Sequence, residues 1–72
     1  MTLATKAFGP YRAEIEPNDD RPGNQCWVVD LASGDCSSLA WLDGEGEFDS
    51  GRKGPSREIL DAIEAWAATQ DA

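Results

Sequence analysis

The chain has 72 residues, enough for one domain, and its formal net charge at pH 7 is −8. A domain of this size buries only about 60% of the surface of its unfolded chain, so its core is thin and we expect no enclosed cofactor cavity. The charge repels nucleic acid and anionic membranes and attracts basic protein surfaces, unless the acidity serves only solubility.

The residue content disfavours most catalytic chemistry. The chain has no histidine, which removes the usual general base and the commonest metal ligand. Its two cysteines cannot form a zinc site unaided. Residues 1–17 lack a signal-peptide pattern, and no apolar run approaches the roughly 20 residues that cross a bilayer. The sequence therefore predicts a cytoplasmic protein that is not an enzyme and binds neither metal nor cofactor.

In chain order, residues 1–9 are predicted to form a loosely ordered arm. In YRAEIE, residues 11–16, apolar and charged side chains then alternate, which is typical of a half-buried strand. The segment PNDDRPGN, residues 17–24, is dense in turn-forming residues and predicts the longest loop.

Three more strands are predicted in QCWVVDL, CSSLAWL and EGEFDS, residues 25–31, 36–42 and 45–50. A three-residue turn with Gly34 left-handed pairs Val29 with Ser37, and a two-residue turn at Asp43-Gly44 follows the third strand. These registers give one apolar face, composed of Trp27, Val29, Leu31, Leu39, Trp41 and Phe48. A two-residue turn at Ser33-Gly34 would divide this set between opposite faces.

The last segment, PSREILDAIEAWAATQ at residues 55–70, has apolar residues at helical spacing and predicts an amphipathic helix. Ser56 is its N-cap if Pro55 lies just outside. Ile59, Ile63 and Trp66 are expected to cover the apolar face of the sheet. The predicted fold is α+β, a four-stranded antiparallel β-meander with one C-terminal helix on one face, forming a single domain over residues 1–72. Three long strands with a short edge strand are the alternative.

Cys26 and Cys36 are predicted to remain separate thiols. They lie at opposite ends of the predicted hairpin, so their Cα atoms should be much farther apart than the roughly 7 Å that a disulfide allows. Unpaired thiols suit a reducing compartment.

The sheet face that the helix leaves uncovered is the predicted interaction surface, because an antiparallel sheet can present one face to water. An apolar strip in its middle is expected to lie between two rows of carboxylates, as in protein contact sites. The predicted apolar contacts are Val28, Ala40 and Leu42. The predicted charged contacts are Glu14, Glu16, Glu45, Glu47 and Asp49.

Two further segments invite a chemical interpretation. The stretch DGEGEFD resembles a calcium loop, but Phe48 stands at the sixth position, where an EF-hand has Gly, and Gly54 at the twelfth, where it has Glu. The basic loop with Arg52, Lys53 and Arg57 lacks the P-loop pattern. Arg57 is expected to pair with Asp61, and the sequence leaves open whether this loop takes part in binding.

These patterns predict a non-enzymatic module that docks through an acidic surface on a basic, nucleic-acid-handling protein, as an inhibitor or adaptor. Rows of carboxylates along strands imitate the charges of phosphates. Anti-CRISPR and other anti-defence inhibitors of phages and mobile elements share this size and charge, but no motif ties the sequence to them. The alternative is an assembly subunit that homodimerises, or joins a larger complex, through its uncovered sheet face.

Overall fold

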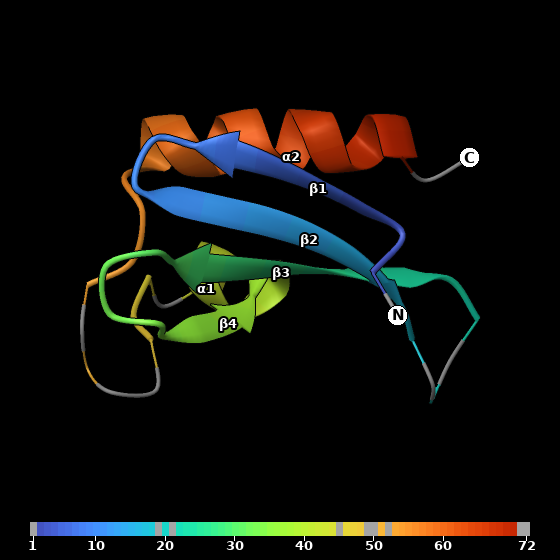
Figure 1. Cartoon of the computed structure of the whole chain (residues 1–72), viewed down its shortest axis with the longest axis horizontal. Coiled ribbons are helices and arrows are strands. Elements are labelled where there is room, and N and C mark those ends of the chain that lie inside the picture. Colours follow the sequence, from blue (N-terminus) through green and yellow to red (C-terminus); the bar gives the residue numbers. More distant parts are fainter. Residues whose placement is uncertain are drawn as a thin grey trace.

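The computed structural model describes residues 2–18, 20, 22–44, 46–48, 51 and 53–70. Its antiparallel sheet has the strand order β1-β2-β3-β4. The strands are β1 (Ala4–Phe8), β2 (Tyr11–Pro17), β3 (Asn24–Asp30) and β4 (Cys36–Ser38), and the helices are α1 (Leu39–Gly44) and α2 (Arg57–Gln70). The predicted α+β fold, a four-stranded antiparallel meander with a C-terminal helix, is confirmed (Figure 1).

The first strand comes from the segment that was predicted to be a loose arm. Residues 4–8 pair with β2 along their whole length, and Gly9, with a φ of 62°, opens the two-residue loop between the two strands. Phe8 also packs edge-on against Trp66, with ring centroids 5.8 Å apart. The arm prediction is therefore wrong for residues 4–8, because an aromatic contact with the last helix and a glycine turn hold them in the sheet.

The predicted third strand ends after three residues and continues as α1. The Ser38 hydroxyl accepts a hydrogen bond from the Trp41 backbone N–H at 3.4 Å, which caps the start of this helix. The helix places Leu42 in the core and leaves Trp41 54% exposed. Asp43 and Gly44, predicted to form a hairpin turn, instead end α1.

The predicted fourth strand does not join the sheet in the described residues 46–48. Glu47 forms an isolated bridge with Lys53, and the Gly54 N–H donates to the Gly46 carbonyl at 2.6 Å. Phe48 is nevertheless buried, as predicted, and stacks on Tyr11 with ring centroids 6.3 Å apart. An aromatic residue thus reaches the core from a loop rather than from a strand.

The register between β2 and β3 decides which side chains face the helices. Ala13 lies opposite Val28, and both are completely buried together with Ile63 of α2. The prediction that Trp27 and Val29 face the core is therefore wrong. The β3 sequence is apolar on both faces, so its pattern alone does not choose between them.

The turn between β3 and β4 is one residue longer than predicted. Asp30 and Asp35 close a four-residue loop with an N–H···O bond of 2.8 Å, and Val29 lies opposite Cys36 instead of Ser37. Gly34 has a φ of 83°, the predicted left-handed conformation. Leu31, predicted to be in the core, lies in this loop and is half exposed.

Both helices contribute to the same core cluster and therefore lie on one side of the sheet. Leu42 of α1 and Leu60 and Ile63 of α2 pack with Ala13 and Val28. Figure 1 views the sheet from the other side, with α1 behind β3 and β4. The N-cap prediction for α2 is confirmed, because the Ser56 hydroxyl accepts the Ile59 N–H at 3.4 Å.

Candidate interaction face

The uncovered side of the central strands forms the candidate site. Side chains alternate along a strand, so the neighbours of the buried Ala13 and Val28 point away from both helices. In the register, Glu14 lies opposite Trp27, and Arg12 lies opposite Val29. We define the uncovered face by six residues of β2 and β3: Arg12, Glu14, Glu16, Gln25, Trp27 and Val29.

The strands that carry this face are the most firmly held in the sheet. β2 pairs with β1 on one side and with β3 on the other, and the β2–β3 ladder runs from Tyr11 opposite Asp30 to Pro17 opposite Asn24. Buried side chains on the covered side fix the same strands against the helices. The uncovered face is therefore a rigid platform, which suits recognition better than a mobile loop does.

The centre of the uncovered face is apolar. Trp27 and Val29 are both half-buried, although neither helix lies over them. Tryptophan is enriched among the residues that dominate binding energy at protein interfaces, because a rigid ring buries a large area at a small entropic cost. Trp27 is the largest apolar side chain among the six residues of this face.

The rim of the uncovered face is acidic. The Arg12 Nε donates to Glu14 Oε2 at 2.8 Å, and the two side chains are 46% and 20% exposed. Arg12 is the one basic residue of the six, since Lys6 lies opposite Ala13 and so faces the other side of the sheet. Two carboxylates against one guanidinium leave the face with a net negative charge.

The structure confirms only part of the predicted placement of site residues. Glu14 and Glu16 lie on the uncovered face, as predicted. Val28 and Leu42 are 0% and 1% exposed, so the prediction of an exposed strip containing them is wrong. Val28 faces the helices through its pairing with Ala13, and Leu42 enters the core because α1 replaces the end of the third strand.

The remaining predicted residues do not extend the uncovered face. Ala40 is exposed, but on α1. Glu47 is exposed in the segment after α1 instead of on a sheet strand, while Glu45 and Asp49 lie outside the described residues. The row of carboxylates predicted along a fourth strand is therefore not seen in the part that the structure describes.

Trp27 and Val29 are the surface residues that sequence reasoning missed. Large apolar side chains were assigned to the core because they usually lie there. A signal was nevertheless available. Residues 26–29 are apolar at every position, and a sheet with helices on one side can cover only one of the two alternating sets.

The two thiols remain separate, as predicted, and Arg57 at the start of α2 is paired with acids of that helix. Cys26 and Cys36 are free, and burial raises the pKa of Cys26 to about 11, which keeps this thiol neutral near pH 7. The Arg57 guanidinium contacts Asp61 at 2.7 Å, as predicted, and Glu64 at 2.8 Å. Lys53 is exposed, and Arg52 lies outside the described residues.

The described residues include neither a metal-binding cluster nor a membrane-spanning helix. They contain no group of three or more His, Cys, Asp or Glu side chains placed to hold a metal ion. Nor do they include a helix with the length and apolarity needed to cross a membrane. In comparisons with known proteins, no family model, no curated protein and no solved structure matches this chain.

Proposed function

We propose that this protein is a small non-enzymatic binding module whose uncovered face docks on a basic protein surface. The observation that carries the proposal is the placement of Glu14 opposite Trp27 on the side of the sheet that neither helix covers. An aromatic anchor with a charged rim matches the anatomy of protein interfaces, in which an apolar centre is surrounded by polar groups.

The charge of the module favours a partner that handles nucleic acid. Such proteins carry basic surfaces for phosphate groups, and a protein with a net charge of −8 is attracted to them. Glu14 and Glu16 stand on the same face two residues apart, and together with Arg12 they leave this face with a net negative charge. A module of this kind would act as an inhibitor or adaptor, and an anti-CRISPR-type inhibitor is one form of it.

Self-association through the same face is the alternative, and one contact argues against it. Two copies meeting face to face would bring the acidic rims together, unless Arg12 of each copy paired with the acids of the other. Arg12 is already held by Glu14 of its own chain at 2.8 Å. With Arg12 and Glu14 paired, the carboxylate of Glu16 gives the face its net negative charge, and two such faces would repel each other. A different, basic partner is therefore favoured.

The test is a pull-down from a lysate of the native host with the tagged full chain, at about 50 and about 150 mM salt, because exposed charges are screened at physiological ionic strength. Three variants are compared with the wild type: Trp27→Ala, the pair Glu14→Gln and Glu16→Gln, and the control pair Glu58→Gln and Asp61→Asn. The control makes the same change in net charge on the exposed side of α2.

We expect a basic protein to be retained by the wild type and the control, and to be lost by Trp27→Ala and by the Glu14 and Glu16 pair. Binding of the purified partner should weaken about ten-fold or more for the Trp27 variant, as at an interface hot spot. Equal loss by the control would assign the binding to net charge alone. Recovery of only the protein itself, by all forms alike, would support the assembly alternative.

A further inference from the structure

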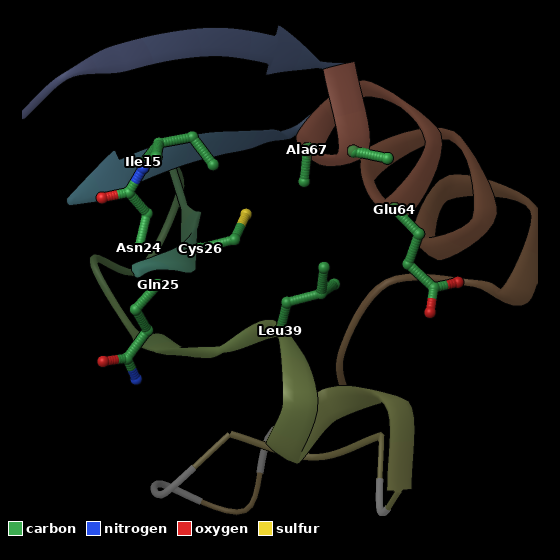
Figure 2. Close-up of a pocket in the computed structure, with 8 residues that line it drawn as sticks. Ile15, Asn24, Gln25, Cys26, Leu39, Glu64 and Ala67 are labelled. Atoms are coloured by element: carbon green, nitrogen blue, oxygen red, sulfur yellow. The ribbon is translucent and has the colours of Figure 1, made fainter. Parts of the chain in front are cut away.

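A groove opens on the helix side of the sheet, between the start of β3, the first turn of α1 and the C-terminal half of α2 (Figure 2). One part of it has a volume of about 240 Å³, and an adjoining part of about 310 Å³ extends over Leu39 and Ala40. Sites for drug-sized ligands are usually about 300–1,000 Å³ and bury most of the ligand. The smaller part is therefore of a size to hold one long side chain.

The wall of the groove is mainly apolar. In Figure 2, Leu39 of α1 and the Cys26 thiol of β3 point into the space below Ala67 of α2, beside Ile15. The Cys26 thiol is neutral near pH 7, and burial moves its pKa further above that pH, to about 11. It therefore belongs to the apolar surface and does not add to the charge of the groove.

The one ionised residue that lines both parts of the groove is Glu64, and no basic residue lines either part. Glu64 Oε2 accepts a hydrogen bond from Arg57 Nη2 at 2.8 Å. Within the described residues, Oε1 of the same carboxylate has no hydrogen-bond partner. The groove thus offers one free carboxylate oxygen at its edge, which favours a cation.

Two side-chain amides lie at the opposite side of the groove from α2. Asn24 and Gln25 line both parts, at the start of β3. Neither amide makes a side-chain hydrogen bond to another residue in the described part of the chain. Amides of this kind can donate to and accept from the peptide groups of a chain that passes over the opening.

We propose that the groove binds a lysine side chain carried by a segment of a partner protein. The methylene stem of the lysine packs against Leu39 and Ala67, its ammonium group reaches Glu64 Oε1, and the peptide groups beside it bond to the amides of Asn24 and Gln25. A long aliphatic stem with a cationic end matches an apolar groove that has one carboxylate at its edge. The groove lies on the helix side of the sheet and shares with the uncovered face only Gln25, at the start of β3. The inference therefore does not depend on the proposed function.

Lysine fits better than arginine because only one oxygen of Glu64 is free. Arginine gains its advantage by donating two parallel hydrogen bonds to both oxygens of a carboxylate. Here Arg57 already occupies one of the two. An ammonium group is a compact point charge and needs a single acceptor.

The test is an NMR titration of the ¹⁵N-labelled full chain with N-acetyl-lysine-N′-methylamide, alongside the corresponding norleucine, arginine and free cadaverine probes. We expect saturable shifts at Cys26, Leu39 and Ala67 with the lysine probe. Norleucine, which has the stem without the charge, should bind about two- to five-fold more weakly, the range for a partly exposed ion pair. Equal binding of lysine and norleucine, or shifts confined to other residues, would overturn the proposal.

Variants of α2 separate the charge from the apolar wall. Glu64→Gln should reduce the affinity for the lysine probe to that for norleucine and leave norleucine binding unchanged. Ala67→Leu should fill the groove and weaken both, and Ala68→Leu serves if the first variant folds poorly. Asp61→Asn is the matched control, because Asp61 also pairs with Arg57 but does not line the groove. Loss of lysine binding by this control equal to that of Glu64→Gln would overturn the role of Glu64.

Three other results would assign the groove to a different occupant and so contradict the proposal. Tighter binding of the arginine probe would overturn the choice of lysine. Tighter binding of cadaverine would indicate a free amine instead of a protein segment. Shifts of the same resonances with protein concentration alone would make the groove an interface between copies of this chain.

Discussion

The two faces of β2 and β3 differ in composition, although alternate residues of the same two strands form both. The covered face carries Ala13 and Val28, which are fully buried, and the helices pack on it. The uncovered face carries the larger Trp27 together with Glu14 and Arg12. The small side chains of Ala13 and Val28 let the helices approach the sheet closely, while Trp27, although bulky, lies on the other face.

The largest difference between the two faces is expected when a charge is placed on each of them in turn. Val28→Asp should lower the free energy of unfolding by about 4 kcal/mol or more, because an unpaired carboxylate would replace the two buried methyl groups of the valine side chain. A loss of that size approaches the total stability of a small domain, about 5–15 kcal/mol. Val29→Asp should cost only about 1 kcal/mol. Urea unfolding measures both, and the reverse ranking would restore the register predicted from the sequence.

The next test adds atoms on each face. A Cβ at Gly54 would lie 2.7 Å from Leu42 Cδ2 and 2.9 Å from the Gly46 carbonyl oxygen, so Gly54→Ala should cost about 1–3 kcal/mol through overpacking. Ala7→Val, on the exposed side opposite Arg12, should stay within about 0.5 kcal/mol. Thermal unfolding of the two variants compares them, and equal costs would mean that the covered side is less tightly packed than described.

A smaller effect is expected from loosening the helix that covers the sheet. Ser56→Ala removes the hydroxyl that caps α2 and should lower the free energy of unfolding by about 1 kcal/mol. This lies toward the low end of the range for lost helix caps, because the hydrogen bond is 3.4 Å long. Partner binding through the uncovered face should be unchanged once the protein is folded. Circular dichroism melts give the stability. A change in partner affinity under conditions in which the variant is fully folded would show that the two faces are coupled.

The mildest test compares the two thiols, one on each side of β3 and β4. Cys36 is exposed and lies opposite Val29, so iodoacetamide should modify it readily at pH 8. Cys26 should react slowly there and faster as the pH approaches about 11, its raised pKa. Mass spectrometry of the labelled protein distinguishes the sites, and early modification of Cys26 would show that burial does not hold its thiol in the neutral form.

The same pKa has a consequence for stability with a defined sign. The folded protein holds the Cys26 proton more tightly than the unfolded chain, whose ordinary pKa is 9.0. The resulting stability is fully present below pH 9 and is lost as the pH rises toward about 11. Cys26→Ala removes this contribution, so the difference between variant and wild type isolates it from the titration of lysines and tyrosine.

The sequence predicted those parts of the fold that depend on local chemistry. The alternation in residues 11–16, the amphipathic stripe of residues 57–70 and the Ser56 cap each rest on neighbouring residues, and each is found. The uncovered sheet face with Glu14 and Glu16 follows from the same local pattern. In the described residues 46–48, the acidic segment predicted after residue 44 is not a strand of the sheet, because α1 begins at Leu39 behind a serine cap.

What the sequence did not predict depends on contacts between distant residues. The face on which Val28 lies is set by its pairing with Ala13 across a loop, and not by the apolar run around it. β1 forms because Phe8 meets Trp66 at the other end of the chain. Neither contact leaves a periodic signal in the sequence. The groove beside Cys26 likewise exists only where β3, α1 and α2 converge.

The order of the strands also has a consequence for how the chain folds. Each strand pairs with its neighbour in sequence, so the sheet can assemble from short loop closures, which generally makes folding fast. The contact between Phe8 and Trp66 is different, because it joins residues near both ends of the described chain. We expect the sheet to assemble early and docking of α2 onto β1 to be the late step that seals the interior. During synthesis, one face of the sheet would then remain exposed to water until α2 has been made and has docked.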